Sequence, residues 1–462
     1  MSATRASSAF PARPKTMPRG CGKPTSAVSA SVEPSSSVWT QTHFTLDPKS
    51  RGIFIWTDTL TKNLPSMRDT TVGMVNVFLR STNCALSINE NCDPDVRVDL
   101  QNALQAIVGD TNDCATDAHR TSAVGVSVDL PIHGGNLALG TWQGLYLLAS
   151  EPGPVEVVAT LCVLDEGNTK NVKLKAPSRG EHGCQDTLSD AMEAINKKRG
   201  GKNNNALVNV TAKHTSASLA IMRSIDDNGN TIPLEPFMSR IVPESWNYPN
   251  QKVTFSHTDE GDDDMPAHVK STLLGVSKTI PLDTKTGNLF LDSNQSLFLV
   301  EHRDGGGFAG TEGSRDATVT VLDDGTIGQT VIDIPSTSWS GKTSTTDVTS
   351  EVQKTLDAFI SGDENINTST GWLHVFAPNP ELSVYIGENN VTEGATVGEL
   401  LVPDEHTENR AQITPALVGV SITIPFADGT LLLGNSQAVI LNDCSKSGGS
   451  RKLVVTAQGG TR

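Results

Sequence analysis

The sequence GVSVDLP at residues 125–131 returns as GVSKTIP at 275–281 and as GVSITIP at 419–425. The three leading glycines are 150 and 144 residues apart, which fits a repeated domain and is too long for one solenoid unit. Each copy continues with a turn rich in glycine, asparagine or aspartate, and then with a leucine-rich run and a conspicuous glutamine: Gln143, Gln295 and Gln437. Short alternating runs between such turns predict antiparallel hairpins. The chain is therefore predicted to contain three diverged copies of one module.

Helical stretches precede the hairpins. In the first copy, Asp93 is a predicted N-cap with Pro94 at the first helical position, and the helix is expected to run to Ile107. In the second copy, apolar residues recur with helical spacing across residues 187–198. Each module is therefore predicted to be α+β, with a largely antiparallel sheet or sandwich plus helices.

Composition suggests where the modules begin and end. Segments rich in glycine, serine, threonine or charge at 165–183 and 323–347 are typical of linkers. The predicted divisions are a tail at 1–38, module 1 at 39–165, module 2 at 184–323 and a degenerate module 3 at 345–462.

Charge and hydropathy restrict the partners. The formal net charge of −16 over 462 residues argues against nucleic acid or an anionic membrane as the main partner, because both need clustered lysine and arginine. No run of about 18 apolar residues is present, so we expect a soluble protein without a transmembrane helix. A small molecule, with or without a phosphate group, is the expected partner, and any anionic groups on it would have to be held locally.

Cysteine usage and the first residues bear on the compartment. The seven cysteines form no CxxC pair, which predicts reduced thiols in an intracellular compartment. Residues 1–32 contain five basic residues, many serines and alanines, and no acid. This composition is typical of a plastid or mitochondrial transit peptide, and a disordered tail of a cytoplasmic protein is an equal alternative.

Longer strings carry a family resemblance. Copy 1 contains NENCDP at 89–94 and GTWQG at 140–144, and copy 2 contains HTSASL at 214–219, DDMPAHVKS at 263–271 and EHR at 301–303. In these strings the chain resembles the YjbQ-type family, small proteins called secondary thiamine-phosphate synthases. Members of that family are single modules that form homotrimers. The resemblance therefore implies a monomeric chain that packs as an intramolecular pseudo-threefold trimer.

The copies depart from the family pattern in complementary ways. Copy 1 has Ser81 in place of the first histidine and lacks the EHR string, and His119 is an uncertain equivalent of the second histidine. Copy 2 has lost the tryptophan of GTWQG and the NEN string. Copy 3, with Ala377 at the expected histidine position, is predicted to keep neither half. If the family's site lies between neighbouring modules, copies 1 and 2 together rebuild one complete site; undirected decay after triplication is the alternative.

Several side chains suggest chemistry. His214, His268 and His302 come from three segments and could converge on a zinc ion with one open position, or could act as acids, bases or phosphate ligands. Asp263 and Asp264 could hold Mg²⁺ or belong to a solvated acidic loop.

The remaining candidates would contact the substrate. Lys270 and Arg303 suit phosphate oxygens, and Trp142 could stack on a flat ring or fill a core. Glu90, with its flanking amides, is a better polar candidate than Asp93, which could be only a helix cap.

Together these residues define one predicted site. The predicted catalytic residues are Glu90, Asp93, His214, His268 and His302. The predicted substrate-binding residues are Asn89, Asn91, Trp142, Gln143, Ser216, Lys270 and Arg303. The possible metal ligands, for zinc or magnesium, are His214, His268, His302, Asp263 and Asp264. The resemblance implies a transferase reaction that joins a pyrimidine diphosphate to a thiazole phosphate, or a related step on another phosphorylated heterocycle; a non-catalytic binding protein or a structural pseudo-trimer is the alternative.

Overall fold

Each repeat folds into two antiparallel sheets with helices beside them. The computed structural model describes residues 38–109, 114–175, 179, 184–199, 206–226, 229, 232, 234–283, 286–304, 314–323, 325–335, 343–362, 369–389, 401–402, 407–445 and 448–460. The N-terminal segment on which the transit-peptide hypothesis rests lies outside these residues. No helix within them is long and apolar enough to cross a bilayer.

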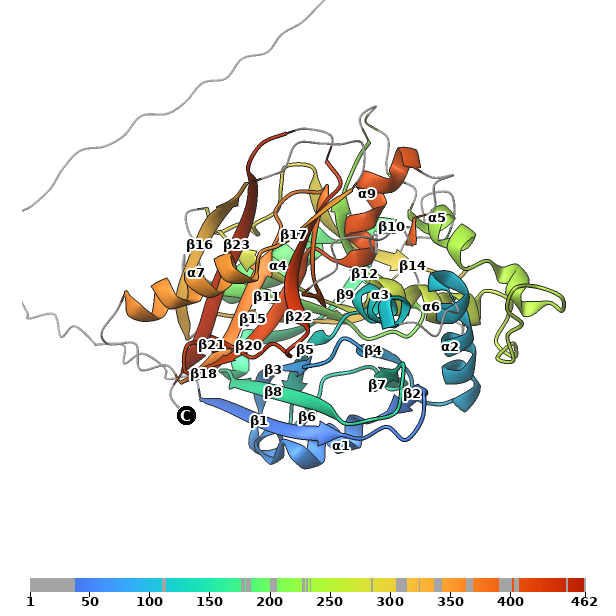
Figure 1. Ribbon diagram of the computed structural model, residues 1–462, viewed down its shortest axis with the longest axis horizontal. Coiled ribbons are helices and arrows are strands. Elements are labelled where there is room, and N and C mark those ends of the chain that lie inside the picture. Colours follow the sequence, from blue (N-terminus) through green and yellow to red (C-terminus); the bar gives the residue numbers. More distant parts are fainter. Residues whose placement is uncertain are drawn as a thin grey trace, which may run out of the picture. The chain divides into compact units, whose positions relative to one another are not determined.

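Module 1 consists of a five-stranded sheet, a three-stranded sheet and helices (Figure 1). Its larger sheet has the order β1 (Trp39–Leu46), β8 (Val155–Val163), β3 (Val72–Leu79), β5 (Ser127–His133), β6 (Asn136–Leu137). Its smaller sheet has the order β2 (Gly52–Ile55), β7 (Gln143–Ala149), β4 (Cys84–Glu90). Its helices are α1 (Thr57–Asn63), the 3-10 helix η1 (Pro65–Asp69), α2 (Pro94–Val108) and α3 (Cys114–Val124).

Module 2 repeats this arrangement. Its larger sheet has the order β13 (Ser277–Leu282), β11 (Ala206–Ala212), β15 (Ser314–Leu322), β9 (Thr169–Lys175), and its smaller sheet the order β10 (Cys184–Asp186), β14 (Gln295–Glu301), β12 (Ala217–Arg223). Its helices are η2 (Glu166–Asn168), α4 (Leu188–Arg199), α5 (Leu234–Ile241), η3 (Glu244–Asn247) and α6 (Asp264–Leu274). The predicted α+β class and the predicted helices at 94–107 and 187–198 are confirmed.

Module 3 has both sheets of the module among its described residues. Its larger sheet has the order β16 (Thr326–Ile334), β23 (Arg451–Gly460), β18 (Thr370–Phe376), β20 (Ser421–Ala427), β21 (Thr430–Leu431), and its smaller sheet the order β17 (Ser344–Asp347), β22 (Gln437–Asp443), β19 (Leu382–Glu388). The helices described in this module are α7 (Thr349–Ser361) and α9 (Thr407–Val418).

The segments interpreted as linkers are parts of the modules. β9 lies within 165–183 and pairs with β15, and β16 lies within 323–347 and pairs with β23. Both are edge strands with exposed polar residues, which is why their sequences look like linkers. The predicted starts of modules 2 and 3, at 184 and 345, are therefore too late.

The repeated motif joins a helix to a strand. Gly125, Gly275 and Gly419 have φ values of 101°, 80° and 95°, a region that side-chain-bearing residues rarely adopt. Their amides donate to carbonyls four residues earlier, at Thr121 (2.7 Å), Ser271 (2.8 Å) and Pro415 (3.0 Å). The glycine thus ends α3, α6 or α9 and lets the chain turn directly into the next strand.

Equivalent residues of the three modules meet in a polar cluster. Asp129, Thr279 and Thr423 occupy the same place in the repeated motif. The Thr279 and Thr423 hydroxyls each donate to Asp129 Oδ2 at 2.7 Å, and Asn76 Nδ2 donates to Asp129 Oδ1 at 2.8 Å. One contiguous hydrophobic core also draws residues from all three modules. The repeats are therefore packed as the pseudo-threefold trimer that three fused modules predict.

Candidate functional site

A cavity of about 470 Å³ takes its walls from modules 1 and 2. Module 1 contributes Glu90, Cys92 and Trp142, and module 2 contributes His214, Thr215, Ser216, Glu260, Asp264, Arg303 and Arg315. These residues lie where elements end: Glu90 closes β4, Asp264 opens α6 and Arg303 follows β14. Residues far apart in the sequence are therefore brought together by the junction of two sheets.

The turn that carries Trp142 is bound to module 2 by hydrogen bonds of Gln143. Its Nε2 donates to the carbonyls of Ala212 (3.1 Å) and His214 (2.8 Å), and its Oε1 accepts from Gly140 N at 2.8 Å. A Cβ on Gly140 would lie 2.6 Å from the Lys213 carbonyl oxygen, so glycine is required for this approach. Trp142 itself is 62% exposed, and it is a wall of the cavity rather than a core residue.

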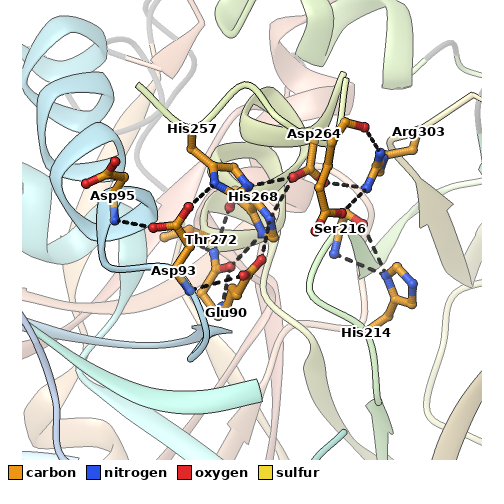
Figure 2. A network of polar contacts seen from close by, with 12 residues as sticks. Glu90, Asp93, Asp95, His214, Ser216, His257, Asp264, His268, Thr272 and Arg303 are labelled. Carbon is orange, nitrogen blue, oxygen red and sulfur yellow. Dashed lines mark hydrogen bonds and ion pairs between the residues drawn. The ribbon is translucent and has the colours of Figure 1, made fainter. Parts of the chain in front are cut away.

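His257 connects the two modules at the back of the cavity (Figure 2). Its Nδ1–H donates to Asp93 Oδ2 at 2.6 Å and its Nε2–H donates to Asp264 Oδ2 at 2.8 Å. The hydrogen bond to Asp264 raises the pKa of His257, burial opposes it, and with Asp93 the pKa reaches about 9. Asp99 of α2 holds the loop, because its Oδ2 accepts from the amides of Ser256 (2.7 Å) and His257 (2.8 Å).

His268 is buried beside Glu90 (Figure 2). Asn89 Nδ2 donates to the His268 carbonyl (2.8 Å) and to Thr272 Oγ1 (2.7 Å), so Asn89 Oδ1 accepts from His268 Nδ1–H at 2.9 Å. His268 Nε2 lies 3.0 Å from Glu90 Oε2 and 3.5 Å from Asp264 Oδ2. Burial alone would lower the pKa of His268, but these two carboxylates outweigh it and raise the pKa.

His214 has the opposite electrostatic character. Ser216 N–H donates to His214 Nδ1 at 3.1 Å, so this ring nitrogen must be unprotonated. Burial, reinforced by the positive charge of Arg315, lowers the pKa of His214 to about 3. The ring is therefore neutral near pH 7 with its proton on Nε2, where it can serve as a hydrogen-bond donor.

Arg303 orients Asp264. Its Nη1 lies 2.5 Å from Asp264 Oδ1 and 3.3 Å from Glu260 Oε2. Burial alone would raise the pKa of Asp264, but hydrogen bonds with His257 and His268 and the charge of Arg303 lower it, so the carboxylate stays ionised. Oδ1 of Asp264 thus faces the guanidinium, and Oδ2 faces the two imidazoles.

Comparison with known proteins identifies the family of this chain. The family model "UPF0047 protein YjbQ-like" matches residues 42–162, 173–324 and 336–460. The chain belongs to the YjbQ-like UPF0047 family. The UPF0047 protein YjbQ of Salmonella typhimurium is 36% identical over 135 residues, covering 27% of this chain and 98% of that protein. Its counterpart in Escherichia coli O157:H7 is 35% identical over 119 residues, covering 24% of this chain and 86% of that protein.

Solved structures include relatives of the single YjbQ-like module. A crystal structure of an uncharacterized YjbQ/UPF0047 protein from Clostridium acetobutylicum is 27% identical, covers 25% of this chain and 96% of its own, and has a TM-score of 0.24. The family matches confirm the resemblance and the three copies. They also extend it, because the third copy matches the family model as well and not only through its hairpins.

The three-histidine metal centre is not formed by the YjbQ-like modules. His302 is fully buried, with Nδ1–H donating to Glu235 Oε2 (2.6 Å) and Nε2 hydrogen-bonded to Ser218 Oγ (2.8 Å). Neither nitrogen is available to a ligand, so the catalytic and metal roles predicted for His302 are wrong. His214 lies apart as well: the described group of potential ligand atoms within 4.8 Å of one another comprises Glu90, His257 and His268.

Two further predicted contacts are also corrected. Lys270 is fully buried, and its Nζ donates to Glu235 Oε1 (2.7 Å) and Ser239 Oγ (2.9 Å), so it cannot reach a phosphate in the cavity. Asp263 does not share a metal ion with Asp264. Its Oδ1 faces Arg303 Nε (3.3 Å), and its Oδ2 accepts from Asp304 N (2.7 Å). The side chains of both residues stabilise the fold.

The other predicted residues lie at or directly behind the cavity. Glu90, Trp142, His214, Ser216 and Arg303 line it. Gln143 and His268 contact the wall residues His214 and Glu90 directly. Behind them, Asn89 bonds His268 and Asp93 bonds His257. Asn91 acts through its backbone, because its N–H donates to the Trp142 carbonyl at 2.7 Å.

His257, Arg315 and Glu260 were not predicted from the sequence. Glu260 lies within the acidic run at 259–264 and His257 precedes it by two residues, so the density of carboxylates was a signal that a nearby histidine would be paired. Arg315 is the second residue of β15, where its Nε donates to Glu301 Oε2 at 2.6 Å, and nothing in its local sequence points to the cavity.

Strand register corrects the comparison between modules. Ala212, Leu79 and Ala377 make the same backbone hydrogen bond to a valine of the repeated motif, so His214 corresponds to Ser81 and to Asn379 rather than to Ala377. Each of these three side chains accepts from the amide two residues later. Module 3 also keeps Glu388 at the position of Glu90, because each pairs with the glutamine of its own module.

Helix register settles the second histidine. Position 268 is seven residues before the motif glycine, which corresponds to Ala118 in module 1 and Gln412 in module 3. His119 is therefore not the equivalent of His268. Glu90 meets His268, whereas the other two junctions pair Glu388 with Ala118 and Arg223 with Gln412 at these positions.

Four cysteines are described as thiols. Cys84, Cys92, Cys162 and Cys444 are free thiols, as the sequence predicts for these four. Burial raises the pKa of Cys84 and of Cys444 to about 11, so both are unreactive. Cys92 is exposed and lines the cavity.

Proposed function

We propose that the chain is an enzyme with one composite site, in the cavity between modules 1 and 2, that acts on a small phosphorylated molecule with a flat ring. The observation that carries this proposal is the convergence on one cavity of an exposed indole, Trp142, with the guanidinium groups of Arg303 and Arg315. An aromatic face suits a heterocycle, and arginine suits phosphate oxygens. The volume of about 470 Å³ is in the range of small-molecule sites.

The charges support a leaving group that gains negative charge. Arg315 is held by Glu301, with Nη2 and Nε each 2.6 Å from Oε2, so its guanidinium is fixed in orientation. His214, neutral with Nε2 protonated, adds a donor that carries no charge of its own. Fixed donors of this kind stabilise developing charge without reorganising during the reaction.

The family resemblance suggests the reaction to test first. In a thiamine-phosphate-synthase-like transfer, the methylene carbon–oxygen bond of a pyrimidine diphosphate breaks and the electron pair leaves with pyrophosphate. The thiazole nitrogen of a thiazole phosphate then forms the new carbon–nitrogen bond. Arg315, Arg303 and the His214 donor would bind the departing pyrophosphate, and Trp142 would stack on a ring.

The test uses matched variants from modules 2 and 3. Arg315→Gln and Arg451→Gln each remove an arginine that is ion-paired with the preceding acidic residue of its module, Glu301 or Asp443. We expect Arg315→Gln to weaken calorimetric binding of pyrophosphate and formation of thiamine phosphate at least tenfold, while Arg451→Gln leaves both unchanged. Equal effects of the two variants would refute the single site. Binding without turnover of the two substrates would make the chain a binding protein.

A further inference from the structure

Four potential ligand atoms converge at the back of the cavity, where the fold brings α6 of module 2 against β4 of module 1. They are His257 Nε2, His268 Nε2, Glu90 Oε2 and Asp264 Oδ2 (Figure 2). His268 Nε2 is buried and has no hydrogen bond of good geometry, although two carboxylates face it. Such a nitrogen is under-used in a protein interior, where polar atoms are normally satisfied.

The distances fit one cation. His257 Nε2 to Asp264 Oδ2 is 2.8 Å, His268 Nε2 to Glu90 Oε2 is 3.0 Å, and His268 Nε2 to Asp264 Oδ2 is 3.5 Å. Metal bonds of about 2.0–2.1 Å place neighbouring ligand atoms about 2.9 Å apart at right angles and about 3.3 Å apart in a tetrahedron. Glu90, His257 and His268 each offer a ligand atom within 4.8 Å of the other two, and Asp264 Oδ2 adjoins both imidazole nitrogens, so these groups could close around one ion.

The outer contacts of both histidines are those that metal ligands have. His257 Nδ1–H donates to Asp93 Oδ2, and His268 Nδ1–H donates to Asn89 Oδ1, whose amide is itself fixed by Thr272. Each ring therefore keeps its proton on Nδ1, and a metal ion that displaces the Nε2 proton would meet the Nε2 lone pair. Arg303 likewise holds Asp264 Oδ1 and turns Oδ2 inwards.

We infer that His257, His268, Glu90 and Asp264 bind one divalent transition-metal ion of the zinc, iron or manganese type. Three carboxylates, those of Glu90, Asp93 and Asp264, surround the two imidazoles. One divalent cation can replace the Nε2 protons of the two imidazolium rings with no change in net charge. Two imidazoles with carboxylates favour these metals over Mg²⁺ or Ca²⁺, which take oxygen ligands.

The metal site exists only between modules 1 and 2. The corresponding positions of Glu90 and His268 are Arg223 and Gln412 at one junction, and Glu388 and Ala118 at the other. Neither pair can complete the same ligand set, so the stoichiometry should be one ion per chain. Glu90 and Asp264 also line the cavity, so the ion would lie beside the proposed substrate. A role of the ion in the reaction rests on the proposed function, but metal binding itself does not.

The experiment measures metal directly on the full chain, without any substrate. After treatment with a chelator and return of Zn²⁺ or Co²⁺, elemental analysis should find one ion per chain, and Co²⁺ should give a visible absorption band. His257→Ala, His268→Ala and Glu90→Gln should each weaken Co²⁺ binding at least tenfold. Asp93→Asn, a positioning change, should weaken it about 10- to 100-fold. His133→Ala, at an exposed histidine of module 1, is the matched control and should bind like the parent chain.

The outcomes separate this inference from the proposed function. Failure of the parent chain to bind Zn²⁺, Co²⁺, Fe²⁺ and Mn²⁺ would overturn the metal site and leave the histidines as an ion-paired network, even if pyrophosphate still binds. Three ions per chain, or binding unaffected by Glu90→Gln in a variant with parental thermal stability, would overturn it as well. One ion bound by a chain that binds no pyrophosphate would keep the metal site and reject the proposed ligand.

Discussion

Replacing Glu235 by glutamine should destabilise the chain strongly, because it leaves a buried lysine without its counter-charge. Glu235 is 1% exposed, and its carboxylate receives Lys270 Nζ at 2.7 Å and His302 Nδ1 at 2.6 Å. Breaking one partner of a buried ion pair costs about 3–5 kcal/mol. With an unfolding entropy of about 2.1 cal/mol/K per residue, a chain of 462 residues that unfolds in one step would lose about 3–5 °C in Tm.

The change of stability with pH tests the same interaction independently. Burial alone would raise the pKa of Glu235, but the charges and hydrogen bonds of His302 and Lys270 lower it from 4.5 to about 2. The ionised carboxylate therefore contributes stability that is fully present above pH 4.5 and is lost as the pH falls towards 2. The difference in unfolding free energy between the parent chain and Glu235→Gln should therefore become smaller as the pH falls from 4.5 towards 2.

Calorimetry at pH 7 and at steps down to the acid limit measures both effects. The control is the double variant Glu235→Leu with Lys270→Met, which removes both charges and should recover more than half of the lost stability. A Glu235→Gln variant with a Tm within 1 °C of the parent chain, or a double variant less stable than the single one, would refute this account of the network.

Two shorter predictions concern the junctions of the modules. Asp129→Ala removes a carboxylate that accepts from Thr279, Thr423 and Asn76, and it should lower the free energy of unfolding in urea by about 2–4 kcal/mol; a change below 1 kcal/mol would contradict a structural role for the cluster. Gly140→Ala puts a Cβ 2.6 Å from the Lys213 carbonyl, so it should push the Trp142 turn away and weaken pyrophosphate binding, whereas unchanged binding would mean that the turn does not need this close approach.

The fold could be predicted from the sequence to the extent that it is local or repeated. The GVSxx[LI]P motif carries its own physical reason, a glycine with positive φ between a helix and a strand, so three copies of it imply three copies of the module. The edge strands β9 and β16 were missed because their solvent-exposed residues lack the apolar alternation that marks an inner strand.

The site was predictable only in part, because burial depends on segments that local patterns do not place. Trp142, His214 and Arg303 line the cavity as expected. Lys270 and His302 were misassigned because Glu235, on α5, neutralises Lys270 and holds His302 inside the core. No sequence pattern pairs a glutamate with residues 35 and 67 positions away.

His257 was missed for a related reason. Its partners Asp93 and Asp99 lie on the opposite module, 164 and 158 residues earlier in the chain. Only the packing of two repeats brings these groups together, and the loop that carries His257 has no periodicity by which to place it.

The glutamine that recurs in the modules makes a structural contact that does not depend on the candidate site. Gln143 Nε2 donates to the carbonyls of Ala212 and His214, and Gln437 Nε2 donates to those of Leu79 (2.8 Å) and Ser81 (2.9 Å). Each also accepts from a glycine amide three residues earlier, at 2.8 Å and 2.7 Å. The same docking contact therefore survives at a junction with the acid–histidine pair and at one without it.

Gln143→Ala and Gln437→Ala should consequently cost similar stability but differ in function. Each variant leaves two backbone carbonyls and one amide without their partner, and we expect each to lose about 1–3 kcal/mol in urea unfolding. Gln143→Ala should also reduce pyrophosphate binding, because the turn that carries Trp142 is released from His214, whereas Gln437→Ala should not. If both variants reduced binding equally, the loss would follow general destabilisation, and the argument for one retained site among three similar junctions would fail.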